Sequence, residues 1–281
     1  MNFCVNDFTI YFEKYGDKKD NLLILPGWGD TRLTFRYLID VLKDKYTIYI
    51  LDYPGFGNSP FPNRDLELFD YSDLIYNFII SNNIKNPTIL AHSFGGRIVI
   101  DLFTRFNLDI KNLILIDIAG IKPKKSILKK IKEKSYKLLK KIGRVLPKKI
   151  RNKYLEKLIY IFGSSDYSKL NPNIRKTFIN IVNFDQKEDI KNINKDTLII
   201  WGEFDKDVPL KDGYFINKNI KDSGLVVIPN SGHFPHLDKA YYVNSIILEY
   251  LKRSQWLLFL ISLYYIRIWW CSCSCCEYIW F

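Results

Sequence analysis

The chain has 281 residues, of which 47% are hydrophobic and 26% are charged. These proportions exclude a disordered chain and a collagen-like fibre, and the length can bury a core without disulfide or metal staples. The formal charge of +12 is concentrated in residues 122–153, which carry 15 Lys or Arg and one acid, so the rest has a net charge of −2. The basicity therefore belongs to one local surface and does not indicate a nucleic-acid-binding protein as a whole.

Short apolar runs alternate with longer amphipathic stretches along most of the chain. Apolar runs of this kind are typical of strands buried on both faces, and their alternation with helices predicts a mostly parallel sheet with helices on both faces. The predicted fold class is therefore α/β. The expected strands are residues 8–13, 22–25, 46–51, 88–90, 113–116, 197–201 and 225–228, and the expected helices are residues 31–43, 70–83, 95–106, 211–219 and 238–252.

Two segments interrupt this alternation. Residues 121–185 contain no strand-like run, and we interpret them as a basic helical cap inserted into the core. Residues 255–281 are almost entirely apolar, Cys or Ser, and we interpret them as an appended tail. The predicted core domain therefore consists of residues 1–120 and 186–254.

The strongest local signal is TILAHSFGG at residues 88–96, where a strand runs into a turn of small residues and then into a helix. A serine at such a turn, here Ser93, is held on a strained backbone with its hydroxyl exposed above the sheet. Ala91 and Gly95 are small enough for the chain to fold back beside it. The helix N-terminus behind Ser93 favours developing negative charge.

A nucleophilic serine requires a base, and the chain has three histidines. His233 lies in a loop after the strand at 225–228, and the carboxyl ends of parallel strands share one edge of the sheet. His236 is a rival that we expect to pack or cap at the start of the last helix. His92 adjoins the serine and is expected to point away from it. We therefore predict that His233 is the base.

The base requires an acid that orients it. Asp205 and Asp207 both lie in WGEFDKDVP, directly after the strand at 197–201. Asp117 ends the strand at 113–116 and reaches the same edge, where it could also serve as a loop-capping carboxylate. These residues leave three candidates for the acid.

An oxyanion formed at the serine requires hydrogen-bond donors. LPGWGD at residues 25–30 follows the strand at 22–25, and its glycines allow the backbone to approach a ligand. The amide groups of Trp28 and Phe94 are the candidate donors of an oxyanion hole. A second glycine-rich loop, DYPGFGNS at residues 52–59, is expected to shape the pocket.

Five motifs together resemble those of the α/β-hydrolase fold family, in the branch with a helical cap. They are PGWG, DYPGFGNS, AHSFGG, WGEFDKDVP and SGHFPHL, in matching order and spacing over residues 1–254. The resemblance implies the triad order Ser93, Asp205, His233, and it selects Asp205 because the acid of the family lies three residues after the Gly. The chain departs from the family at Ala91, where Gly is usual, and at Pro26, where many members have His.

The resemblance implies a serine hydrolase that cleaves a carboxylic ester, or a related acyl bond, of a small or lipid-like substrate through an acyl-enzyme. Ser93 argues against the members that use an aspartate nucleophile. One alternative is a C–C bond hydrolase of dienoic keto-acids with the same triad, and another is a non-catalytic ligand- or membrane-binding member. No cofactor, metal or obligate protein partner is expected.

Residues 127–146 place apolar side chains at helical spacing with lysines between them, which predicts a basic amphipathic helix. The helix is expected either to cover the active site or to dock on an anionic membrane, and nucleic acid is not expected. Four of the five cysteines lie within residues 271–276, so no disulfide framework can span the fold, and a reducing, cytoplasmic location is predicted. The apolar stretch at 256–270 leaves a peripheral or tail-anchored position open.

Overall fold

A computed structural model describes residues 1–5, 8–122 and 171–252, together with separate positions between 135 and 158. The predicted amphipathic helix at 127–146 lies largely outside the described residues, and the predicted tail at 255–281 lies entirely outside them. Among the residues that the structure describes, none of the helices combines the length and the apolar character that crossing a membrane requires.

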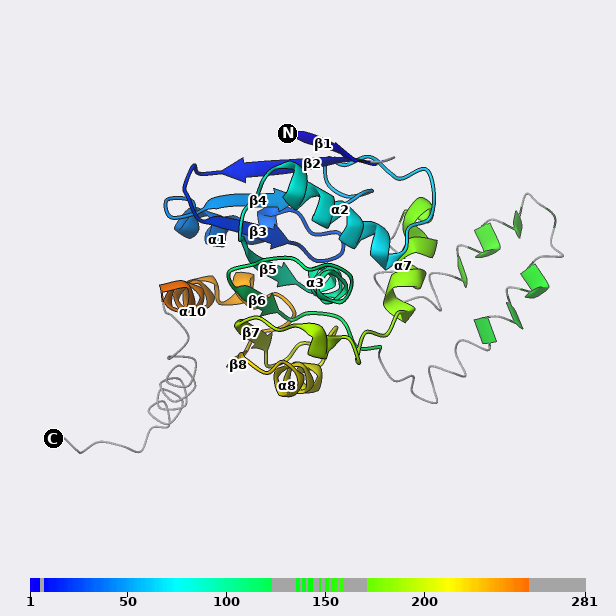
Figure 1. Ribbon diagram of the computed structural model, residues 1–281. Helices are drawn as coiled ribbons and strands as arrows, with labels where there is room; N and C mark the ends of the chain where they lie inside the picture. The colour runs from blue at the N-terminus through cyan, green and yellow to red at the C-terminus, as the bar shows by residue number, and fades with distance from the viewer. Residues whose placement is uncertain are drawn as a thin grey trace, which may run out of the picture. The chain divides into compact units, whose positions relative to one another are not determined.

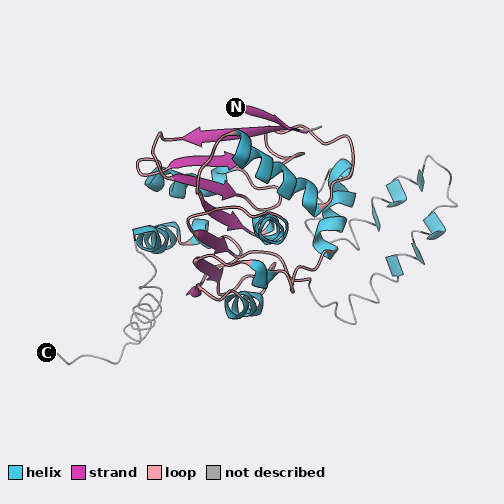
Figure 2. Ribbon diagram, viewed as in Figure 1, coloured by secondary structure: helices cyan, strands magenta, loops and turns pink. Residues whose placement is uncertain are grey.

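The core is an eight-stranded sheet in the order β1-β2-β4-β3-β5-β6-β7-β8 (Figures 1 and 2). Strands β1 and β2 pair antiparallel, as do β2 and β4, and all the other pairs are parallel. The predicted α/β class with a mostly parallel sheet is confirmed. The strands are β1 (Asn2–Val5), β2 (Phe8–Tyr15), β3 (Asn21–Leu25), β4 (Thr47–Leu51), β5 (Thr88–His92), β6 (Leu113–Ile116), β7 (Thr197–Gly202) and β8 (Ser223–Ile228).

Helices cover both faces of this sheet, as Figure 1 shows. One face is covered by α1 (Arg36–Leu42) and α10 (Ala240–Lys252), whose side chains form one cluster with the strands. The opposite face carries α2 (Leu68–Ser81), α3 (Phe94–Arg105) and α8 (Leu210–Asn219). Every residue of β5 and β6 is buried, and burial on both sides explains the apolar runs at residues 89–91 and 113–116.

Three elements differ from the predicted pattern. The expected helix at 31–43 is a 3-10 helix, η1 (Arg32–Phe35), followed by α1. The last helix is divided into α9 (Pro235–Asp238) and α10, because the backbone leaves the helical region at Lys239. Strand β1 was not predicted, because it lies at the edge of the sheet and alternates between exposed and half-buried residues instead of forming a buried run.

The chain divides into two compact units. The first comprises residues 1–62, 68–121 and 186–281, and the second comprises residues 63–67 and 122–185. Within the second unit, η2 (Pro172–Ile174) leads into α7 (Arg175–Asn183), and the amide of Leu66 donates to Oγ1 of Thr177 at 2.9 Å. The short 3-10 helix η3 (Ile190–Asn192) belongs to the first unit and precedes β7.

Candidate active site

Ser93 lies at the junction between β5 and α3, on the edge of the sheet where the parallel strands end. Its φ of +49° is in the left-handed region, which a non-glycine residue adopts only under strain. Hydrogen bonds hold this turn: the Ser93 amide donates to the carbonyl of Ile116 at 3.1 Å, and the Ser93 carbonyl accepts from Gly96 and Ala119 at 3.0 and 2.9 Å. This is the strand–turn–helix geometry that presents a serine hydroxyl above a sheet.

Packing explains why two glycines follow the serine. A Cβ atom on Gly95 would lie 2.2 Å from the carbonyl oxygen of Leu25, and one on Gly96 would lie 2.2 Å from the Cβ of Ile118. Neither contact is sterically possible, so α3 can approach β3 and the segment after β6 this closely only with glycine at both positions. The motif therefore encodes the close helix–sheet contact that holds the turn.

Ser93, His233 and Asp205 form one chain of hydrogen bonds. Nε2 of His233 lies 2.9 Å from Oγ of Ser93, and Nδ1 of His233 lies 2.7 Å from Oδ2 of Asp205. The three residues follow β5, β8 and β7, so three separate loops bring them to the same edge of the sheet. The Asp205 side chain is fully buried, and that of His233 is 12% exposed. The arrangement can pass a proton from the hydroxyl to the ring while the carboxylate fixes the tautomer of the ring.

The loop after β7 holds the Asp205 carboxylate in a fixed orientation. Its second oxygen, Oδ1, accepts hydrogen bonds from the amides of Asp207 at 2.8 Å and Val208 at 3.0 Å. Asp207, the alternative acid in the same motif, is exposed. The structure therefore brings Asp205 to His233, while Asp207 contributes its backbone amide.

Asp117, the third candidate acid, lies beside this pair in a different role. It is fully buried, and its Oδ1 accepts from the amide of Gly202 at 2.8 Å. Burial raises the pKa of Asp117 to about 9; the hydrogen bond from Gly202 opposes the rise, and the nearby charge of Asp205 adds to it. Asp117 therefore keeps its proton at neutral pH and lies next to the pair as a neutral carboxylic acid.

The other two histidines also pack at this site. The ring centroid of His92 lies 4.9 Å from that of His233 and 4.8 Å from that of His236. His236 lies in α9, is 2% exposed and stacks on Phe35 with ring centroids 4.7 Å apart, which agrees with the expected packing role. Burial lowers the pKa of His236 well below its usual range, so this ring is neutral.

The predicted oxyanion loop, residues 25–30, follows β3, which is a neighbour of β5 in the sheet. Gly29 adopts a φ of +78°, and the amide of Asp30 donates to the carbonyl of Gly27 at 3.2 Å. The Trp28 ring lies edge to face on the ring of Phe94, with centroids 5.1 Å apart, so the two residues with candidate donor amides are in contact. Phe94 is also the first residue of α3, and the first amides of a helix have no partner within it. Their role as donors stays a prediction.

Asp30 is a site residue that the sequence reasoning missed. Its Oδ2 lies 3.1 Å from Nδ1 of His92, whose Nε2 lies 2.8 Å from the carbonyl oxygen of His233. His92 thus connects the predicted oxyanion loop with the loop that carries His233. The one signal in the sequence that could have indicated Asp30 is its place at the end of PGWGD. Its partner His92 is 62 residues away along the chain.

Asp117, Asp205 and His233 each offer a carboxylate oxygen or a ring nitrogen within 4.8 Å of the others. This spacing would also suit a small cation. However, His233 and Asp205 already use their facing atoms in a hydrogen bond, and Asp117 binds the amide of Gly202. Hydrogen bonding accounts for this group, and we assign no metal to it.

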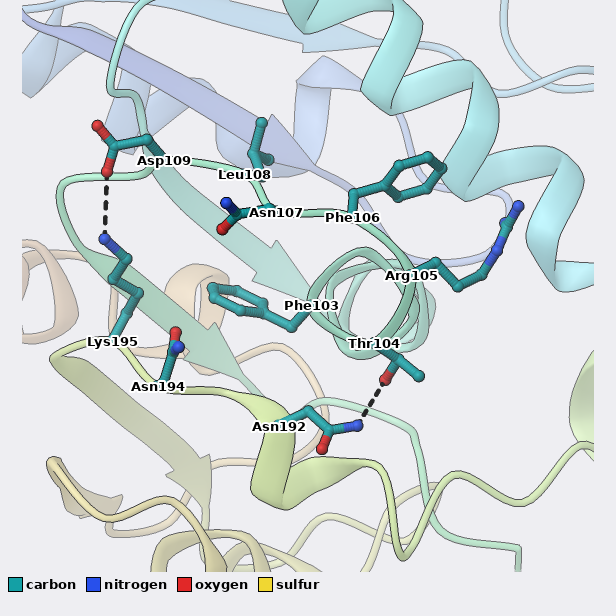
Figure 3. A pocket seen from close by; sticks show the side chains of 10 residues that line it. All are labelled: Phe103, Thr104, Arg105, Phe106, Asn107, Leu108, Asp109, Asn192, Asn194 and Lys195. Carbon is teal, nitrogen blue, oxygen red and sulfur yellow. Dashed lines mark hydrogen bonds and ion pairs between the residues drawn. The ribbon is translucent and has the colours of Figure 1, made fainter.

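A separate pocket of about 640 Å³ lies at the opposite edge of the sheet, before β6 and β7 begin (Figure 3). Lys195 pairs with Asp109 across it at 3.2 Å, and Nδ2 of Asn192 donates to Oγ1 of Thr104 at 3.1 Å. Arg105, at its border, pairs with two acids of the surrounding helices. The charged side chains that line the pocket, Arg105, Asp109 and Lys195, therefore each have a partner of opposite charge.

The sequence profile of the alpha/beta hydrolase fold matches residues 20–153 of this chain. The chain is 24% identical to YugF, an uncharacterized hydrolase of Bacillus subtilis, over 89% of this chain and 97% of that protein. It is 26% identical to the pimeloyl-acyl-carrier-protein methyl ester esterase of Wigglesworthia glossinidia brevipalpis, over 85% and 96% of the two chains.

Solved structures show the same architecture. An esterase from Exiguobacterium antarcticum superposes with a TM-score of 0.67 over 88% of this chain and 96% of that one, at 23% identity. At this level of identity the likeness concerns the fold, and the residues of the site must be judged on their own geometry.

Proposed function

The chain belongs to the α/β-hydrolase fold family, and from that premise we propose that it is a serine hydrolase that cleaves a carboxylic ester through an acyl-enzyme. The observation that carries the proposal is the continuous relay from Oγ of Ser93 through the ring of His233 to the buried carboxylate of Asp205. The esterases among the relatives support an ester as the bond that is cleaved.

In the first half of the proposed reaction, Oγ of Ser93 attacks the ester carbonyl while Nε2 of His233 takes the hydroxyl proton. Asp205 stabilises the imidazolium that forms, and the carbonyl electrons move onto the oxygen. The amides of Trp28 and Phe94 bind this oxyanion, where one well-placed donor is worth about 10²–10³ in kcat. The C–O bond then breaks, and the alcohol leaves with the proton from His233.

In the second half, water replaces the alcohol. His233 removes a proton from water as the water oxygen attacks the acyl carbon, and a second oxyanion forms in the same place. Its collapse breaks the bond to Oγ, returns the proton to Ser93 and releases the acid. His233 must be neutral at the start of both halves. Asp205 accepts the hydrogen bond from its Nδ1–H, which fixes the tautomer whose free Nε2 faces Ser93.

Steady-state hydrolysis of p-nitrophenyl esters from acetyl to long acyl chains tests this proposal. We expect turnover by the native chain and its loss in Ser93→Ala, with Ser245→Ala, at a half-buried serine of α10, as the matched serine control. Cleavage of a dienoic keto-acid without ester turnover would indicate the C–C hydrolase instead. No turnover of any of these substrates would favour a binding protein.

For the acyl group we propose a small or lipid-like chain. The lipid-like choice is supported by the predicted basic segment at 122–153, which would suit an anionic membrane surface. Co-sedimentation with vesicles at low salt tests this part. Stronger binding to anionic than to neutral vesicles would support it, and equal binding would remove it.

A further inference from the structure

His92 is fully buried between two acceptors. Nδ1 faces Oδ2 of Asp30 at 3.1 Å, and Nε2 faces the carbonyl oxygen of His233 at 2.8 Å. A backbone carbonyl can only accept, so the proton of that contact must be on Nε2. A neutral ring has a single N–H, which leaves Nδ1 without one toward Asp30.

A second proton must therefore lie between Nδ1 and Oδ2 for both contacts to be hydrogen bonds. It could be carried by the ring or by the carboxyl group of Asp30. We place this proton on the ring nitrogen, from which it can be donated to the carboxylate oxygen 3.1 Å away. The arrangement is then an imidazolium paired with a carboxylate whose side chain is 13% exposed.

The oxyanion loop packs directly on this pair. A Cβ atom on Gly27 would lie 2.6 Å from Oδ2 of Asp30 and 2.9 Å from Nδ1 of His92. The backbone that leads into Trp28 therefore rests against these two side chains, and a side chain at position 27 would collide with them. Pro26, which stands where many family members have His, cannot supply a hydrogen bond from its side chain to this loop.

We propose that His92 and Asp30 are positioning residues, and that His92, protonated on both nitrogens, ties the oxyanion loop to the loop that carries His233. The pair aligns the predicted donor amide of Trp28 with the base, although neither side chain touches the substrate. This inference rests on the proposed function, because it assigns the loop a role in ester hydrolysis.

The groups around His92 are compatible with a charged ring. The titratable side chains that face it are Asp30, His233 and His236, and the rings of Phe35 and Phe234 complete its surroundings. His236 is neutral, and His233 directs its nitrogens toward Asp205 and Ser93. Among the residues that the structure describes, Asp30 is therefore the one carboxylate in contact with His92.

Ester hydrolysis by three variants tests the positioning role. In Asp30→Ala the loop loses its support, so we expect kcat to fall at least about tenfold while KM stays within about twofold. In Asp30→Asn the side-chain amide can donate to Nδ1 of a neutral His92, so kcat should stay within about threefold of the native value. Asp40→Ala, which removes an exposed acid of α1, is the matched control.

The variants also define the results that would overturn the inference. Native kcat in Asp30→Ala would contradict the positioning role. Equal losses in Asp30→Asn and Asp30→Ala would contradict support by hydrogen bonding. Absence of ester turnover in the native chain would instead contradict the proposed function, and the protonation of His92 could still be measured.

Nitrogen-15 NMR of the imidazole rings measures that protonation without an activity assay. With three histidines in the chain, the His92 signals can be assigned by their loss in His92→Asn. We expect both nitrogens of His92 to carry protons at pH 7 in the native chain, and Nε2 alone in Asp30→Asn. A neutral His92 ring in the native chain would overturn the inference, even if Asp30→Ala failed to fold.

Discussion

The backbone amide of Gly202 donates a 2.8 Å hydrogen bond to Oδ1 of Asp117, which joins the end of β7 to the turn after β6. Asp117 itself has a φ of +43°, so this turn has a strained backbone. The bond anchors the start of the loop that carries Asp205. A fully buried carboxyl group is thus part of the framework of the site without belonging to the proposed relay.

The proton on Asp117 makes stability depend on pH. Its pKa is about 9 in the folded chain against an ordinary value of 3.8, so the folded state binds the proton more tightly than the unfolded state. The resulting stabilisation is fully present below about pH 4 and is lost as pH rises toward 9. Asp117→Asn keeps the acceptor for Gly202 but has no proton to lose.

We therefore expect the melting temperature of the native chain to fall more steeply between pH 5 and 9 than that of Asp117→Asn. The two should be similar at about pH 5, with the variant the more stable at about pH 9. Thermal unfolding by circular dichroism measures this difference. Parallel curves for the two proteins would show that Asp117 does not hold its proton in the folded state.

Gly202 and Gly232 form a matched pair for a packing test. A Cβ atom on Gly202 would lie 1.9 Å from the carbonyl oxygen of Gly232, a backbone atom that cannot move away easily. A Cβ atom on Gly232 would have its nearest neighbour at 3.9 Å. We expect Gly202→Ala to lower the free energy of unfolding in denaturant by about 3 kcal/mol, and Gly232→Ala to lower it by less than about 1 kcal/mol. Equal losses would show that the two loops are not packed in this way.

Two tyrosines make a second matched comparison. The hydroxyl of Tyr71 is buried without a hydrogen-bond partner among the residues that the structure describes. The hydroxyl of Tyr250 donates to the carbonyl of Asp196 at 2.8 Å. Removing a buried hydroxyl that has no partner should stabilise the fold, so Tyr71→Phe should raise the free energy of unfolding in urea by about 1 kcal/mol. Removing a hydroxyl that is hydrogen-bonded should destabilise it, so Tyr250→Phe should lower this free energy by about 1 kcal/mol. Destabilisation by Tyr71→Phe would indicate a bond that this geometry lacks.

The proposed relay predicts a large, local loss in Asp205→Asn. The amide would disturb the tautomer of His233, so kcat for ester hydrolysis should fall on the order of 10³–10⁴-fold. Asp207→Asn, two residues away in the same loop, should stay within about threefold because its exposed carboxylate does not face His233. Equal effects of the two substitutions would argue against Asp205 as the orienting acid.

The sequence predicted the parts of the site that depend on local pattern. Ser93, Asp205 and His233 each follow a short apolar run in the sequence, and parallel strands end at one edge, so their convergence could be expected from order alone. The α/β class followed from the same alternation of runs. Strand β1 could not be found in this way, because an edge strand that is half exposed has no buried run to mark it.

The missed contacts depend on distances between remote side chains. His92 was expected to point away from Ser93, but nothing in its neighbours along the chain indicates Asp30 as its partner. Asp117 was weighed as the acid because it ends a strand. Whether it or Asp205 meets His233 is decided by loop geometry, and its protonation follows from burial that the local sequence does not reveal.

Mass spectrometry of the intact chain after treatment with a fluorophosphonate tests the central claim most directly. Attack by an activated serine should add one phosphonyl group, which peptide mapping should place on Ser93, and Ser93→Ala should remain unlabelled. Labelling that persists in Ser93→Ala, or native protein that stays unmodified while correctly folded, would contradict a nucleophilic Ser93.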